Sequence, residues 1–177
     1  GAYIRVGERS RPVAYQVPWS RFADRTTVVD TRGRLVAQIA EQPISDSTPI
    51  GGVITGRRSV EWQDSHPAQL TWAEALDGGD PRAEAEQRDS VWALGAPFTD
   101  APREVFRTED RYYGTQFTDM GETGFAVEYD RDTRVIRRWL IDFEADGAAP
   151  RLAAERRLPG QYANPGTPPT TRNALGR

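Results

Sequence analysis

The chain has 177 residues, of which 37% are hydrophobic and 28% charged, and its formal net charge is -3. A chain of this length forms one ordinary domain, and its nearly balanced charge generates no field that would attract a nucleic acid. All 23 basic residues are arginine and no cysteine is present, which excludes disulfide bonds, thiolate zinc sites, a cysteine nucleophile and lysine Schiff-base chemistry in this chain.

The apolar runs and the first residues of the chain bear on its location and on whether it is a fragment. No apolar run approaches the roughly 18 residues of a membrane-spanning helix, and the first residues form no signal segment, so we expect a soluble chain without a membrane partner. The chain begins at Gly1 in a strand-like segment without an initiator methionine, which indicates a fragment or a processed product. The absence of lysine and the abundance of alanine, glycine and proline are typical of a GC-rich bacterial genome.

Short alternating segments separated by turn residues predict an all-β fold. The predicted strands are residues 27–31, 34–39, 59–63, 70–76, 90–94, 104–107, 113–117, 124–129, 135–142 and 151–155. Between them, Arg32-Gly33, Asp77-Gly78-Gly79 and Asp146-Gly147 supply the positive-φ positions that tight hairpins need. Residues 80–88 could form one or two helical turns, a solvated loop or an acidic contact loop.

Related sequence units recur about every 50 residues. Glu74 and Glu128 lie in similar strands, Pro102-Arg103 is repeated as Pro150-Arg151, and residues 27–40 have the hairpin character of residues 90–108. This spacing predicts one domain over 1–177, a partial β-propeller of about three four-stranded antiparallel blades. The predicted blades cover about 1–50, 51–110 and 111–163, and residues 164–177 lead into a missing blade.

Serine catalysis has little support in the sequence. An α/β-hydrolase carries its nucleophile on a G-x-S-x-G elbow, which is absent here. His66, the single histidine, has Asp64 and Ser65 beside it, but neighbours in sequence rarely have the geometry of a triad. We therefore expect His66 to be a histidine of a surface loop.

Acidic residues offer two further hypotheses. Glu74 and Glu128 could form the carboxylate pair of a glycosidase, although their equivalence by repeat favours the same structural role in two blades. Asp77, Asp80 and Asp89 could hold calcium, but the EF-hand pattern is absent and acidic hairpin tips are common. We assign no catalytic, cofactor-binding or metal-binding residue.

Aromatic and basic side chains could form a binding surface. Four tryptophans lie in predicted strands, and we favour packing between blades over a sugar-binding or peptide-binding surface. They are Trp62, Trp72, Trp92 and Trp139. Arg137 and Arg138 could attract an acidic peptide to a central tunnel, but only one of them can point there, because neighbours in a strand face opposite sides.

The segment 72–114 carries a family signature. Its residues are Trp72, Glu74, Ala75, Asp77-Gly78-Gly79-Asp80-Pro81-Arg82, Arg88-Asp89, Ala96-Pro97-Phe98-Thr99 and Pro102-Arg103-Glu104. This series resembles the β-propeller of prolyl oligopeptidase-type serine peptidases, most closely their glutamyl endopeptidase-like branch. The resemblance extends to residues 11–22, where Val13 and Ala14 are smaller than usual, and to residues 160–168, which lack an Asp-Arg pair and have Asn164 in place of an aspartate.

The resemblance implies a non-catalytic propeller fragment of a serine peptidase that hydrolyses peptides. The catalytic serine, aspartate and histidine would belong to an α/β-hydrolase domain of the same parent chain, which this chain lacks, and the propeller would gate access to that domain. The implied partners are the hydrolase domain and peptide substrates, without a cofactor, and the parent would be cytoplasmic or exported to the periplasm. The alternatives are a stand-alone propeller module that binds a protein or peptide, and a carboxylate glycosidase.

Overall fold

The computed structural model describes residues 1–10, 18–64, 66–118, 122–145, 149–158, 166 and 169. Within these ranges the chain forms β-strands and one short 3-10 helix, η1 (Trp19–Arg21), and no α-helix. The predicted all-β class is confirmed. The family motifs at residues 11–17 and most of the motif at 160–168 lie outside the described residues.

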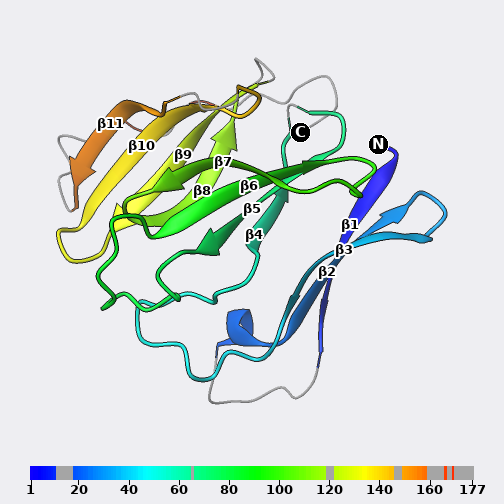
Figure 1. Ribbon diagram of the computed structural model, residues 1–177, viewed down its shortest axis with the longest axis horizontal. Helices are drawn as coiled ribbons and strands as arrows, with labels where there is room; N and C mark the ends of the chain where they lie inside the picture. The colour runs from blue at the N-terminus through cyan, green and yellow to red at the C-terminus, as the bar shows by residue number, and fades with distance from the viewer. Residues whose placement is uncertain are drawn as a thin grey trace.

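Three antiparallel sheets follow one another along the chain, each built from strands that are consecutive in the sequence. Sheet A contains β1 (Tyr3–Arg9), β2 (Asp24–Asp30) and β3 (Leu35–Gln42). Sheet B contains β4 (Arg58–Trp62), β5 (Gln69–Ala75), β6 (Asp89–Gly95) and β7 (Arg103–Thr108). Sheet C contains β8 (Arg111–Phe117), β9 (Thr123–Asp130), β10 (Val135–Asp142) and β11 (Arg151–Arg157). Figure 1 shows sheet B between sheet A at the lower right and sheet C at the upper left.

Each predicted strand overlaps an observed one, because the alternation of apolar and polar residues matches the period of a half-buried strand. One detail of the prediction is wrong, because sheet A has three strands rather than four in the described part of the chain. Of the conformations left open for residues 80–88, the structure has turns and bends: the Asp80 carboxylate accepts a hydrogen bond from the backbone N–H of Arg82 at 2.9 Å and closes a local turn.

The hairpin turns have the predicted chemistry. In the turn between β2 and β3, Gly33 has a φ of 78°, and Asp30 Oδ1 accepts hydrogen bonds from the backbone N–H groups of Arg32 and Arg34. Gly78 and Gly79 also have positive φ values, 68° and 74°. The third predicted turn, Asp146-Gly147, lies outside the described residues.

The apolar core between sheets A and B is centred on aromatic side chains. Val28 and Ile39 of sheet A pack with Leu70, Trp72 and Leu94 of sheet B, and all five side chains are buried. In the loop after β6, the ring of Phe98 lies 5.3 Å from that of Tyr3 on β1 and 6.1 Å from that of Trp62 on β4. The loop side chain therefore connects the two sheets.

A second core joins sheets B and C. Phe143, which follows β10, is fully buried, and its ring lies 5.9 Å from that of Phe106 on β7 and 4.9 Å from that of Phe117 on β8. The four strand tryptophans contribute to the two cores: Trp72 lies inside the first, Trp62 and Trp92 pack against it, and Trp139 packs against the second. The structure thus supports packing rather than a binding surface for these side chains.

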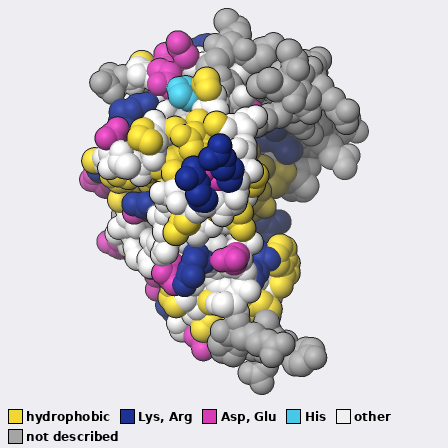
Figure 2. All heavy atoms as spheres, turned by 90° about the vertical axis from the view of Figure 1, so that its right-hand side faces the viewer, with side chains coloured by type: hydrophobic (Ala, Val, Ile, Leu, Met, Phe, Trp, Pro, Cys, Tyr) yellow, Lys and Arg dark blue, Asp and Glu magenta, His cyan; other side chains and the backbone are white. Residues whose placement is uncertain are grey.

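The surface mixes both signs of charge. On the face in Figure 2, basic and acidic side chains are interspersed among hydrophobic ones rather than gathered into one field of a single sign. Among the described residues, no helix is long and apolar enough to cross a membrane.

Truncation of Phe143 tests the second core. We expect Phe143→Ala to lower the free energy of unfolding by about 3–5 kcal/mol, because it leaves a cavity between sheets B and C. The matched control is Leu35→Ala, whose side chain is 67% exposed and whose loss we expect to change stability by at most about 0.5 kcal/mol. Urea unfolding of both variants measures the difference, and equal losses would show that Phe143 does not join the sheets.

Candidate functional site

Two buried aspartates lie at the seam between sheets B and C, Asp77 after β5 and Asp89 at the start of β6. Their side chains are 0% exposed. Arg111, the first residue of β8, bridges them: its Nη2 lies 2.6 Å from Asp77 Oδ2 and its Nη1 lies 2.7 Å from Asp89 Oδ1. The backbone N–H of Tyr112 also donates to Asp89 Oδ2 at 2.7 Å. The first strand of sheet C is therefore attached to sheet B through these carboxylates.

Two further arginines complete this seam network. Arg88 Nη1 lies 2.8 Å from Asp77 Oδ2, and Arg58 Nη2 lies 2.6 Å from Asp89 Oδ2. Burial alone would raise the pKa of Asp77, but the hydrogen bonds from Arg111 and Arg88 outweigh it and hold that pKa below its ordinary 3.8. Guanidinium groups thus stabilise the Asp77 carboxylate, and two of them also pair with Asp89.

The Asp77-Gly78-Gly79 turn explains part of the family signature. The backbone N–H of Gly79 donates to Asp77 Oδ1 at 2.9 Å and holds the carboxylate in place. A Cβ atom on Gly79 would lie 2.1 Å from the carbonyl oxygen of Val53, so only glycine fits. The turn therefore orients the buried Asp77 and packs against the segment that leads into sheet B.

The three aspartates considered for calcium all have arginine partners. Asp77 and Asp89 pair with the arginines of the seam network, and Asp80 forms a bidentate ion pair with Arg82. In the ranges given above, no group of three or more potential ligands is placed to hold a metal ion.

An acidic cluster lies beside the seam, around Arg137 of β10. Its Nη1 lies 2.5 Å from Asp110 Oδ2 and 3.7 Å from Glu128 Oε1, and its Nε lies 2.6 Å from Glu155 Oε2. Burial raises the pKa of Asp110 to about 6, the carboxylates of Glu128 and Asp130 add to this effect, and Arg137 opposes it. Asp110 is thus an acid that titrates close to neutral pH.

Asp110 opens onto a pocket of about 310 Å³. Arg88 and Arg111 of the seam network line the same pocket, together with Tyr129 and Asp130. No serine, cysteine or histidine is among its lining residues. The pocket can exchange a proton through Asp110 and offer arginines to an anion.

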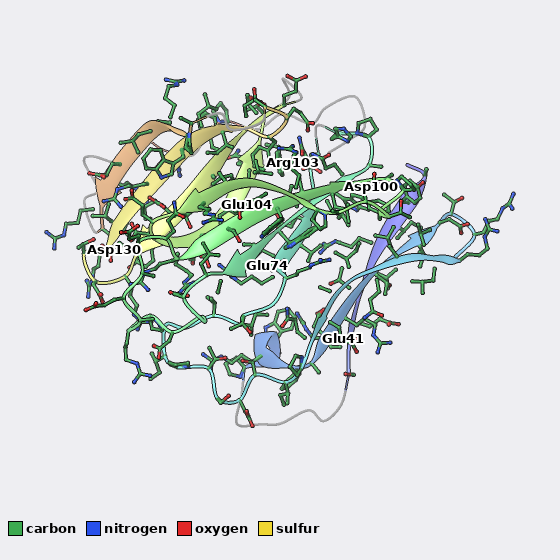
Figure 3. All side chains as sticks on the ribbon, viewed as in Figure 1. Glu41, Glu74, Asp100, Arg103, Glu104 and Asp130 are labelled. Atoms are coloured by element: carbon green, nitrogen blue, oxygen red, sulfur yellow. The ribbon has the colours of Figure 1, made fainter. Side chains whose placement is uncertain are left out.

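The repeated glutamates have similar partners in two sheets, although Trp72 lies on the same strand as Glu74 and Trp139 lies on the strand beside Glu128. Glu74 on β5 accepts a hydrogen bond from Trp72 Nε1 at 2.8 Å, and Glu128 on β9 accepts one from Trp139 Nε1 at 2.9 Å. Each also faces an arginine, since Arg57 Nε lies 3.4 Å from Glu74. Figure 3 shows Glu74 on the central sheet and Asp130, at the end of β9, on the neighbouring one. This equivalence supports a structural role rather than a glycosidase pair.

His66 is part of a local turn. Its backbone N–H donates to the Gln63 carbonyl at 2.9 Å, and its Nδ1 accepts a long hydrogen bond from the Ala68 N–H at 3.5 Å. Both of these contacts are with backbone groups of the same loop. Ser65 lies outside the described residues.

The two arginines of β10 have different partners. Arg137 is surrounded by carboxylates, so it does not offer its charge to an acidic peptide. Arg138 Nη1 donates to the carbonyl oxygen of Gly166 at 2.5 Å.

The sequence analysis did not single out Arg58, Arg111 or Asp110. The available signal for the two arginines was that an arginine begins the first strand of both sheet B and sheet C.

The chain is similar over nearly its full length to two plant proteins. It is 31% identical over 180 residues to a probable chloroplastic glutamyl endopeptidase of Oryza sativa subsp. japonica and 33% identical over 180 residues to one of Arabidopsis thaliana. Each alignment covers 98% of this chain but 19% and 18% of the relative. No family model and no solved structure matches. These similarities support a peptidase-related family and are consistent with a fragment of a larger peptidase.

The chain therefore spans about a fifth of the length of the curated relatives it matches. Because both relatives come from plants, the expected bacterial origin stays a prediction.

Removing Arg111 tests the seam network. We expect Arg111→Met to lower the free energy of unfolding by about 3–5 kcal/mol, because two buried carboxylates lose a partner. The control is Arg107→Gln, which breaks a partly exposed pair with Glu104 and should cost at most about 1 kcal/mol. Chemical denaturation of the two variants measures both free energies of unfolding. If Arg111→Met loses no more stability than Arg107→Gln, Arg111 does not attach sheet C to sheet B.

The raised pKa of Asp110 predicts a pH dependence of stability. Between pH 3.8 and about 6 the folded state keeps a proton on Asp110 that the unfolded state releases, so stability falls as pH rises through this window. The shift corresponds to a loss of up to about 3 kcal/mol. We expect Asp110→Asn to remove this decline in unfolding experiments across the window, and an unchanged pH profile in the variant would refute the assignment.

Proposed function

We propose that this chain is a non-catalytic part of the propeller of a serine peptidase, of prolyl oligopeptidase type and glutamyl endopeptidase-like. The observation that carries the proposal is the alignment of 98% of the chain with less than a fifth of two relatives named glutamyl endopeptidase. The relatives' name concerns those proteins, and its extension to the parent of this chain is part of the proposal.

The topology supports the propeller arrangement. Propeller blades are antiparallel sheets of consecutive strands packed face to face around an axis, and sheets A, B and C follow in chain order with an apolar core at each of the two seams. Each sheet lies within one predicted blade, over 1–50, 51–110 and 111–163. Arg103 and Arg151 begin the fourth strands of sheets B and C, as repetition of one blade would require.

The contacts of the candidate catalytic groups support a non-catalytic role. His66 belongs to a local turn, and Glu74 and Glu128 each hold a tryptophan indole. The acyl-transfer chemistry would then come from a serine, histidine and aspartate of a hydrolase domain elsewhere in the parent chain. The proposed partners are that domain and peptide substrates, with the complete propeller restricting the size of peptides that reach the active site.

The native gene product tests this proposal. We expect its intact mass to be several times the 19.8 kDa of this chain, and we expect it to cleave peptides and to be labelled by a fluorophosphonate that reacts with activated serines. The 177-residue chain serves as the control and should show neither labelling nor hydrolysis.

A native mass near 19.8 kDa would refute the proposed peptidase function and favour a stand-alone binding module.

The proposed gating role is tested by a separate measurement on the full-length protein. Short peptides should be cleaved faster than long ones that share the same cleavage site, and rates independent of length would refute a gate.

A further inference from the structure

A second pocket, of about 410 Å³, lies at the other seam, between the ends of sheets A and B. Five arginines line it, namely Arg5, Arg9, Arg21, Arg57 and Arg58. Asp24 and Glu61 are its acidic lining residues. The lining is thus basic in a chain whose net charge is -3, and we call this cavity the arginine pocket.

The two seams differ in the partner of the arginine that begins the first strand of each sheet. Arg58 begins β4 and Arg111 begins β8, so the two residues occupy equivalent positions in sheets B and C. Asp24 begins β2 as Asp89 begins β6. Arg111 reaches across its seam to Asp89 of the preceding sheet, whereas Arg58 pairs with Asp89 of its own sheet. Arg58 and Asp24 both line the arginine pocket.

Both Nη atoms of Arg58 are buried without a hydrogen bond of good geometry. The side chain is 10% exposed, and Nη2 lies 2.6 Å from Asp89 Oδ2 as an ion pair, whereas Nη1 has no acceptor. Arg111, by contrast, donates from both Nη atoms to carboxylates. Buried polar atoms in native proteins nearly always have a partner, so an unsatisfied donor in a pocket wall indicates an absent acceptor.

Two neighbouring arginines have only uncharged acceptors. Arg5 donates to the Val60 carbonyl and Arg21 to the Thr48 carbonyl at 2.9 Å, so their guanidinium groups are oriented without their charge being cancelled. Arg57 and Arg9 are already paired, since Arg57 Nε lies 3.4 Å from Glu74 Oε1 and Arg9 Nε lies 3.8 Å from Asp24 Oδ2. Arg57 also lies over the Trp72 ring, 4.5 Å from its centre, which fixes it further.

We propose that the arginine pocket binds a carboxylate ligand. Planar guanidinium groups bind carboxylates through paired hydrogen bonds, and the equivalent Arg111 binds two carboxylates in this same chain. The carboxylate can belong to a free dicarboxylic acid or to an acidic side chain of a peptide. Because the pocket is formed by residues of this chain, the inference does not depend on the proposed peptidase function.

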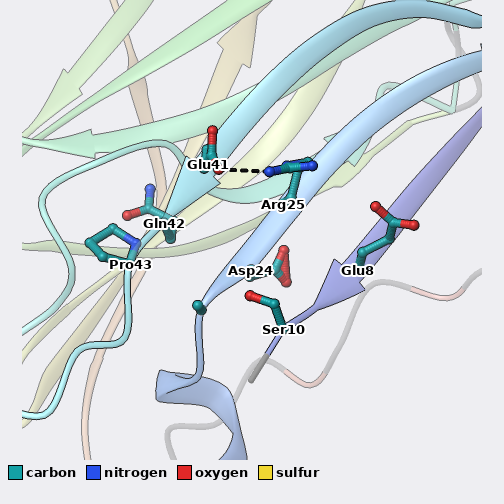
Figure 4. A pocket seen from close by; sticks show the side chains of 8 residues that line it. Glu8, Ser10, Asp24, Arg25, Glu41, Gln42 and Pro43 are labelled. Atoms are coloured by element: carbon teal, nitrogen blue, oxygen red, sulfur yellow. Dashed lines mark hydrogen bonds and ion pairs between the residues drawn. The ribbon is translucent and has the colours of Figure 1, made fainter. Parts of the chain in front are cut away.

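A neighbouring pocket provides an internal comparison. It has a volume of about 400 Å³ and shares Asp24 and Gln42 with the arginine pocket, but Glu8 and Glu41 add negative charge to its lining. Its arginine, Arg25, is paired with Glu41 at 3.0 Å, as Figure 4 shows. The acidic lining repels anions, so binding should be confined to the arginine pocket.

Titration of glutarate into the full 177-residue chain tests the inference, with the indole N–H signals of the tryptophans as NMR reporters. Arg9 lies 3.6 Å from the centre of the Trp19 ring, and Arg57 lies over Trp72, so both signals should shift, whereas that of Trp139 in the other core should not. Arg21→Gln and Arg58→Lys should each weaken binding about tenfold or more. Arg32→Gln, an exposed hairpin substitution outside the pocket, should leave it unchanged.

Several results would overturn the proposal. These are no shift with glutarate, the same shifts with its uncharged diamide, tighter binding of inorganic phosphate than of glutarate, or equal effects of Arg21→Gln and Arg32→Gln. Thermal unfolding confirms that each variant is folded. A parallel titration with a short peptide ending in glutamate decides the source of the carboxylate: tighter binding than glutarate assigns a peptide, and weaker binding assigns a free acid.

Discussion

The attachment of sheet C to sheet B depends on Arg111, which bridges two fully buried aspartates. Charges removed from water are tolerated only when they are paired with good geometry, so the positions of Asp77, Asp89 and their arginine partners constrain one another. The turn at Gly79 orients Asp77, and the backbone N–H of Tyr112 binds Asp89. This network and the Phe143 core, on the same seam, determine how the two sheets pack.

The contacts that join the sheets differ between the two seams. Between sheets B and C, an aromatic core is supplemented by the network around Arg111. Between sheets A and B, the Phe98 side chain contacts Tyr3 and Trp62, but the arginine at the equivalent position turns back to its own sheet. The repeated unit thus keeps an apolar core at both seams, while the partner of its first-strand arginine differs between them.

Repetition also distinguishes the two repeated glutamates from Asp110. Glu74 and Glu128 both hold a tryptophan, so their recurrence follows from the needs of the sheet. Asp110 has a different environment, because burial and the neighbouring carboxylates raise its pKa to about 6. Its charge state therefore changes near neutral pH, close to the arginines that line the same pocket.

The sequence alone determined the all-β class, the strand positions, the hairpin turns and the relation to peptidases, because strand alternation, positive-φ glycines and the Trp72–Gly114 signature are local patterns. It could not reveal that Arg58 and Arg111 share Asp89, or that Asp110 lies beside Arg137, since these residues are 22 to 31 positions apart and meet only when strands pair within a sheet and sheets pack together. Side-chain partners, burial and the raised pKa of Asp110 come from contacts distant in sequence, so the tertiary structure alone decided them.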